Sequence, residues 1–140
     1  MALSSSDLVI KWILLSNGVY DILCALSILS HGKLPLVGCL AQLHSTMYKE
    51  EIQKRDLFDS VFKRMLAFWI FTYGCIRLVA GLDASYFMDI LAAVSYFIEA
   101  VAFEYESRVG DSMDQAKVTF VSIFSGALGV LMLMRPCGYL

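Results

Sequence analysis

Four long apolar segments, separated by polar stretches, divide the chain. They cover about residues 8–28, 65–82, 86–103 and 118–134. A membrane-spanning helix needs about 20 mainly apolar residues, so each segment is a candidate span. Only Asp83-Ala84-Ser85 separates the second segment from the third, which predicts a tight helical hairpin. The pattern predicts an all-α, integral membrane four-helix bundle that forms a single domain over residues 1–140.

A polar segment, Tyr48–Arg64, precedes the second apolar segment. Within it Phe58, Val61 and Phe62 recur at three- and four-residue intervals, and Met65 extends the same face. This period is typical of an amphipathic helix, which can lie at the membrane surface. We therefore expect an interfacial helix that continues directly into the second span.

The composition agrees with a membrane protein and excludes some other classes. Hydrophobic residues make up 59% of the chain and charged residues 17%, whereas soluble domains are about 45–50% apolar and about 25% charged. The net charge of −2 provides no basic surface for nucleic acid. Cys24, Cys39, Cys75 and Cys137 form no CxxC pair, so we interpret them as free thiols.

Basic residues gather in the polar stretches on one side of the predicted bundle. The stretch between the first and second spans contains Lys33, Lys49, Lys54, Arg55, Lys63 and Arg64, and the stretch between the third and fourth contains Arg108 and Lys117. The opposite side has only Lys11 and Arg135. Since lysine and arginine concentrate in cytoplasmic loops, we expect both stretches in the cytosol and both termini in the lumen or an equivalent compartment.

Arg77 lies inside the second span and needs a partner. A guanidinium stays charged at any accessible pH, and placing it in hydrocarbon costs roughly 2.5–3.5 kcal/mol on insertion scales. Asp89 lies in the third span, at about the same distance from the hairpin loop as Arg77. The sequence therefore predicts an Arg77–Asp89 ion pair that fixes the hairpin. The alternative role for these residues is that of a ligand-binding charge.

Glu99 and Asp21 lie toward the cytosolic side of the third and first spans. Two acids at like depth can share a proton or a cation, which is an acid/base arrangement in principle. The structural alternative, which we prefer, gives each acid a partner within the chain: Lys63 or Arg64 for Glu99, and Asn17 or Tyr73 for Asp21.

The fourth span carries two pairs of small residues, Ser122 with Gly126 and Ser125 with Gly129. Small residues four apart let helices approach closely, so Gly126 and Gly129 predict packing within the bundle or against a partner. An aromatic series runs around the second span: Phe68, Trp69, Phe71 and Tyr73. We interpret it as lipid contact and core packing, with a sterol-like ligand as the alternative.

No motif for a catalytic nucleophile, a phosphate, a dinucleotide or a metal is present. Neither histidine, His31 or His44, lies in the middle of a span, so paired haem ligands are not expected. We therefore predict no catalytic residue, no cofactor and no metal ion.

The second span also carries a resemblance. Arg64, Trp69, Arg77 and Ala80 follow one another at intervals of five, eight and three residues. This spacing resembles the signature stretch of the ergosterol biosynthetic protein 28 family. Glu99 with Phe103, and Lys11 with Trp12, resemble its third-span segment and the start of its first span.

The resemblance implies a non-catalytic scaffold of the endoplasmic reticulum that gathers the enzymes of sterol C-4 demethylation. Its expected partners are other integral membrane proteins and membrane lipid. One alternative is an accessory subunit of an energy-transducing complex in an organellar inner membrane. The less favoured alternative is a small sterol-isomerase-like enzyme that uses Asp21, Glu99 and Trp69.

Overall fold

Four helices make up most of the computed structural model, which describes residues 5–30, 33–34, 39–40, 47–49, 60–83, 85–134 and 137. The helices are α1 (Ser5–Leu29), α4 (Ser60–Leu82), α5 (Tyr86–Arg108) and α6 (Gln115–Met134). Each contains a stretch long and apolar enough to cross a membrane. The predicted all-α four-helix bundle is confirmed, and the chain is a multi-pass membrane protein.

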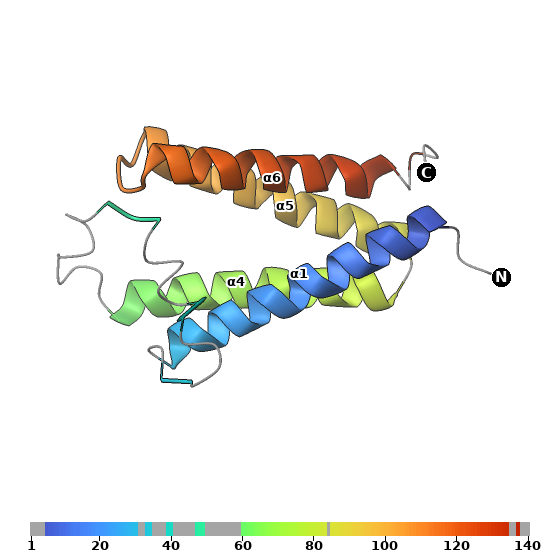
Figure 1. Ribbon diagram of the computed structural model, residues 1–140, viewed down its shortest axis with the longest axis horizontal. Coiled ribbons are helices and arrows are strands. Elements are labelled where there is room, and N and C mark those ends of the chain that lie inside the picture. The colour runs from blue at the N-terminus through green and yellow to red at the C-terminus, as the bar shows by residue number, and fades with distance from the viewer. Residues whose placement is uncertain are drawn as a thin grey trace.

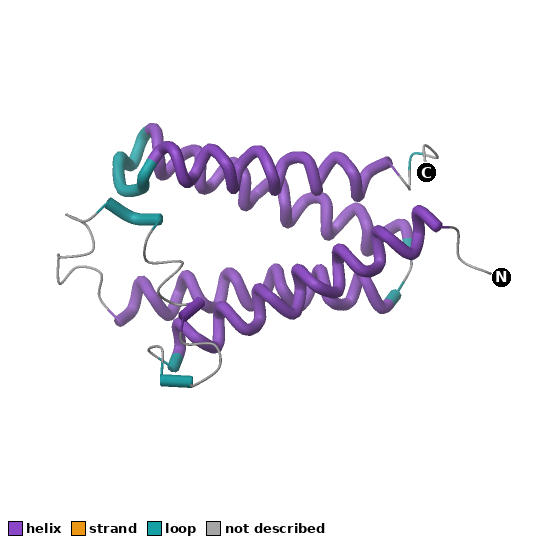
Figure 2. Tube along the Cα trace, in the orientation of Figure 1, coloured by secondary structure: helices purple, strands orange, loops and turns teal. Residues whose placement is uncertain are grey.

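The helices form two antiparallel pairs. Helix α1 packs along α4, and α5 packs along α6, whereas α4 and α5 contact each other less extensively (Figures 1 and 2). The start of α1 and the end of α6 lie at the same end of the bundle, which we call the terminal end. The two pairs come together there and separate toward the opposite end, which we call the loop end (Figure 1).

Small residues let α1 and α4 approach closely. They recur every seven residues: Ala67, Gly74 and Gly81 on α4, and Gly18 and Ala25 on α1. A Cβ atom built on Gly18 would lie 2.7 Å from the Leu78 backbone nitrogen and 2.9 Å from the Gly74 carbonyl oxygen. A seven-residue repeat keeps one stripe of a helix facing its partner. The α1·α4 contact is therefore an approach of backbone to backbone.

The apolar core is continuous at the terminal end and divided at the loop end. Residues of all four helices form the terminal cluster: Ile10, Leu14, Ala80, Ala92, Ala93, Tyr96, Leu128 and Met132. Farther along, one cluster joins α1 to α4 around Cys24 and Ala67. Another joins α5 to α6 around Phe103 and Val118. Leu66 of α4 is partly buried against both of these clusters, so the cores of the two helix pairs are distinct at the loop end but meet at this side chain.

Two chain segments meet at the loop end. Tyr48 forms an isolated antiparallel bridge with Met113, and the Asp114 backbone nitrogen donates to the Met47 carbonyl at 2.8 Å. Lys49 forms an ion pair with Asp111. Burial raises the pKa of Tyr48 to about 12. These contacts place residues 47–49 beside residues 111–114 at the loop end.

The helices extend beyond the predicted spans. Helix α4 begins at Ser60, so residues 60–64 are helical and continue directly into the second span, as predicted for the end of the amphipathic segment. Helix α5 continues to Arg108, through part of the polar stretch predicted as a loop. Backbone hydrogen bonding continues through polar residues, so a helix does not have to end where its apolar part ends. Of the predicted amphipathic helix at Tyr48–Arg64, residues 50–59 lie outside the described residues.

All four cysteines are free thiols, as predicted.

The close α1·α4 contact predicts a large effect for a single methyl group. In Gly18→Ala the new methyl would meet two backbone atoms that cannot rotate away, so the helices must separate. We expect a loss of stability of about 1–3 kcal/mol, which is usual for overpacking, measured by thermal unfolding in mild detergent. Gly126→Ala is the matched control, because a Cβ there meets nothing within 4 Å. Equal stability of the two variants would contradict the close contact.

The four-span arrangement predicts opposite exposure for two natural thiols. Cys39, in the stretch between the first and second spans, and Cys137, after α6, are both exposed. In sealed vesicles with the cytosolic face outward, a membrane-impermeant maleimide should label Cys39 at once and Cys137 only after permeabilisation. Single-cysteine variants separate the two signals. Labelling of both thiols from the same face would refute the four-span topology.

Candidate functional site

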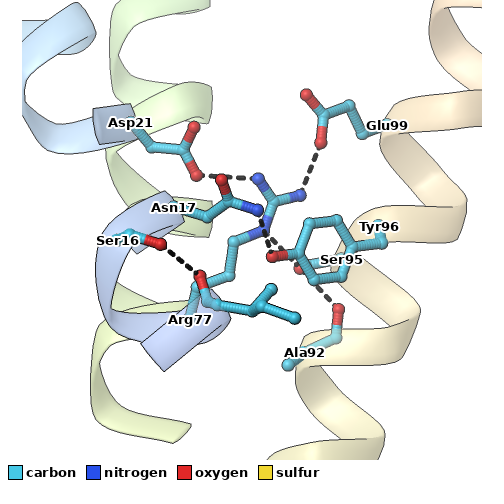
Figure 3. A network of polar contacts seen from close by, with 9 residues as sticks. Ser16, Asn17, Asp21, Arg77, Ala92, Ser95, Tyr96 and Glu99 are labelled. Carbon is cyan, nitrogen blue, oxygen red and sulfur yellow. Dashed lines mark hydrogen bonds and ion pairs between the residues drawn. The ribbon is translucent and has the colours of Figure 1, made fainter. Parts of the chain in front are cut away.

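A charged network in the middle of the bundle joins three helices through Arg77 of α4 (Figure 3). The side chain of Arg77 is only 3% exposed. Its Nη1 donates to Oδ2 of Asp21 on α1 at 2.7 Å, and its Nη2 donates to Oε2 of Glu99 on α5 at 2.5 Å. Its Nε donates to Oγ of Ser95 at 3.2 Å. One guanidinium therefore binds acids from both helix pairs.

Aromatic rings complete the surroundings of the guanidinium. Its central carbon lies 3.8 Å from the ring centre of Tyr96 and 5.6 Å from that of Tyr73. A cation over an aromatic face is attracted by the ring's quadrupole. Asn17 of α1 donates from Nδ2 to the Tyr96 hydroxyl at 2.8 Å. This bond is a second link between α1 and α5 and fixes the ring against the charge.

The predicted Arg77–Asp89 pair is wrong, because Arg77 pairs with Asp21 and Glu99. Side chains of a helix tilt toward its N-terminus. In the antiparallel hairpin Arg77 therefore extends away from the loop, toward Ser95 and Glu99, whereas Asp89 inclines toward the loop. Asp89 is fully buried in the first turn of α5. Equal distance from the loop consequently did not bring the two charges together.

The partners that the sequence offered for the two acids are also wrong. Asp21 binds Arg77 rather than Asn17 or Tyr73, and Glu99 binds Arg77 rather than a basic residue at the membrane edge. Arg64 is exposed on the first part of α4. The preference for a structural role over an isolated acid pair agrees with this geometry.

The other predicted site residues fall into separate places. The Trp69 ring packs at 5.2 Å from the Tyr73 ring and 6.4 Å from the Phe103 ring, measured between centres. Gly129 faces α5, where a Cβ would lie 2.9 Å from the Phe97 ring. Gly126 has nothing within 4 Å of a Cβ position. The two glycines thus serve different surfaces, one inside the bundle and one outside.

Sequence reasoning missed several residues that build the network. The seven-residue recurrence of small residues on α1 and α4 was visible and could have indicated Gly18 and Gly74. No sequence signal marks Ser95 or Tyr96 as contacts of Arg77, because both face the guanidinium only once α5 is packed against α4.

A cavity of about 560 Å³ extends from the charged network toward the loop end. Arg77, Asp21 and Glu99 line its inner end. Its walls are mostly apolar and aromatic, with Trp69 on α4 and side chains of α5 and α6: Phe103, Phe120, Val121 and Phe124. Its volume is in the range of small-molecule sites.

Comparisons with known proteins assign no function to this site. No protein-family model, curated protein or solved structure matches the chain. Among the described residues no group of three or more histidine, cysteine or acidic side chains could hold a metal ion. The geometry offers instead a buried cation bound by two carboxylates, and a cavity that reaches both acids.

The network predicts that loss of Arg77 is costly and that the cost can be reversed. Arg77→Met leaves the buried carboxylate of Asp21 and the partly buried carboxylate of Glu99 without their cation, and removal of one partner from a buried ion pair costs about 3–5 kcal/mol. The triple variant Arg77→Met, Asp21→Asn, Glu99→Gln removes every charge and should recover much of this loss. Thermal unfolding in mild detergent measures both. A triple variant as unstable as Arg77→Met would contradict the network.

Two comparisons sharpen this test. Combining Arg77→Met with Asp89→Leu should bring no recovery, because Asp89 is not an ion-pair partner of Arg77. Arg108→Met removes an arginine from the same bundle whose ion pair with Glu104 is exposed. Exposed pairs contribute about 0–1 kcal/mol, so this control should remain close to the unmodified chain.

Proposed function

We propose that the chain is a non-catalytic scaffold that holds other integral membrane proteins together. The resemblance carried by Arg64, Trp69 and Arg77 supports the endoplasmic reticulum as its location. It also supports the enzymes of sterol C-4 demethylation as its partners. In this proposal the charged network stabilises the bundle, and the outer faces of the helices bind the partners.

The observation on which the proposal rests is the position of Gly126. A Cβ at this residue would have nothing within 4 Å, so packing within the described part of the chain does not require a small residue there. Ile123 and Val130 on the same helix are exposed. In a membrane, small residues on an outer face let a second helix approach closely. Gly126 therefore fits a docking position for a helix of another protein.

The charged network supports the proposal from inside the bundle. Arg77 is satisfied by Asp21, Glu99 and Ser95 without a bound substrate. Charged residues inside spans are usually functional, but here a structural role accounts for three of them. The buried charges are therefore paired within the bundle, and partners can bind its outer surface without contacting them.

One observation favours a second candidate, the sterol-isomerase-like enzyme. Asp21, Glu99 and Trp69, the residues that such an enzyme would use, line the same cavity. The ion pairs oppose this candidate, because each acid already binds Arg77 through one of its oxygens, and this structural bond accounts for its presence inside a span. The two candidates differ in what they require: a scaffold needs its outer face, whereas an enzyme needs its acids.

The scaffold proposal predicts that bulk at Gly126 separates partners while the bundle stays folded. Gly126→Leu places a large side chain at the proposed contact, and we expect recovery of co-purified membrane proteins to fall about tenfold, which corresponds to 1.4 kcal/mol. Native purification in mild detergent followed by mass spectrometry measures recovery and identifies the partners. Val101→Leu, at an exposed position of α5, is the control and should retain them.

The same experiment separates the candidate functions. Glu99→Gln should leave partner recovery and sterol intermediates unchanged wherever the protein folds and assembles. Abolished sterol turnover in a folded, assembled Glu99→Gln protein would favour the enzyme. Recovery of respiratory or photosynthetic subunits, rather than sterol enzymes, would favour the accessory subunit of an energy-transducing complex.

A further inference from the structure

With both acids ionised, the network at the inner end of the cavity has more negative charge than positive charge. Arg77 contributes one positive charge, and Asp21 and Glu99 contribute one negative charge each, so the ionised network has a net charge of −1. Burying an uncompensated charge in an apolar region is costly. A cation bound beside the two acids would remove this cost. The scaffold role does not require such a cation, so the inference goes beyond the proposed function.

The two carboxylates have acceptor atoms available for such a cation. Each uses one oxygen to bind Arg77, and the other oxygens, Oδ1 of Asp21 and Oε1 of Glu99, accept no hydrogen bond from a described residue. In Figure 3 both of these oxygens lie on the side of the network away from Ser95 and Ala92. Since α5 runs from Ala92 through Glu99 to Phe103, that side is where the cavity extends.

The walls of the cavity decide what kind of cation fits. Trp69, Phe103, Phe120 and Phe124 surround the space beyond the two acids. A small inorganic cation takes about six or more oxygen ligands, and apolar walls of this kind do not supply them. An ammonium group donates a few hydrogen bonds and is attracted by aromatic faces, and an apolar body attached to it would contact the walls.

We propose that this cavity binds a lipophilic amine, an amphiphile with one ammonium group and an apolar body. The ammonium donates to Asp21 Oδ1 and Glu99 Oε1, and the body extends toward Trp69. Eight residues separate Arg77 from Trp69, so the body has about 12 Å along the helix axis. Lys117, whose ion pair with Asp114 lies at the other end of the cavity, disfavours the reverse orientation.

Tryptophan fluorescence can test this site directly. The chain has two tryptophans, so Trp12→Phe leaves Trp69, on the cavity wall, as the only one. The probe is dodecylamine brominated at its chain end, because bromine quenches tryptophan at short range. In lipid nanodiscs we expect saturable quenching of Trp69 by the amine and much weaker quenching by the equally brominated dodecanol. Equal quenching by both would overturn the cationic assignment and favour a neutral lipid.

Variants of the Trp12→Phe protein locate the binding site. Glu99→Gln brings the net charge of the network to zero and should weaken amine binding about tenfold or more, because a hydrogen bond to a charged group is lost. Glu104→Gln changes the same residue type on the same helix outside the cavity and should bind normally. Equal binding by these two variants would overturn the proposal.

A second variant leaves the charged network unchanged in case Glu99→Gln impairs folding. Val121→Trp would fill the cavity from α6 and add a fluorophore, so amine binding to it is followed by the rise in unfolding temperature. We expect no rise for Val121→Trp and a saturable rise for the unmodified chain. A rise in the filled variant equal to that of the unmodified chain would show that the amine binds elsewhere and would refute this site.

Discussion

A permanent positive charge in the middle of a membrane-spanning helix constrains the rest of this structure. Arg77 cannot release its proton, and its side chain is almost fully buried. Its environment must therefore supply acceptors, which come from different helices: Asp21 from α1, and Ser95 and Glu99 from α5. The network thus links the α1·α4 pair to the α5·α6 pair. Contact between the two pairs is less extensive than contact within each pair, so this link is important for their arrangement.

Close helix packing and charge pairing depend on each other in this bundle. Gly18 and Asp21 are three residues apart on α1, and Gly74 and Arg77 are three residues apart on α4. Residues three apart lie on the same face of a helix, one turn from each other. The glycine contact therefore brings the two backbones together one turn from the charges, and it allows Arg77 to reach Asp21 at 2.7 Å. A wider α1·α4 separation would leave this pair too far apart.

The sequence predicted the helices well and the contacts within the site poorly. Apolar length identifies four spans because the bilayer requires about 20 apolar residues for each. The need of Arg77 for a partner follows from its charge alone. The choice of Glu99 over Asp89 as a partner depends on the direction in which the side chains tilt along their helices. Distance from the hairpin loop, which is what the sequence provides, does not include this direction. Similarly, Gly126 and Gly129 look alike in sequence, yet only Gly129 meets a neighbouring helix.

The excess negative charge of the network follows from its geometry. If Asp21 were the only acid, Arg77 would be neutralised, but α5 would lose its ion pair with α4. If Glu99 were the only acid, α1 would lose the corresponding link. One guanidinium on α4 therefore needs two carboxylates to form ion pairs with both α1 and α5. When both carboxylates are ionised, one negative charge is left uncompensated. Because the helix pairs separate toward the loop end, this charge lies beside a cavity instead of a packed core. The interaction that stabilises the bundle thereby also gives the cavity its polarity.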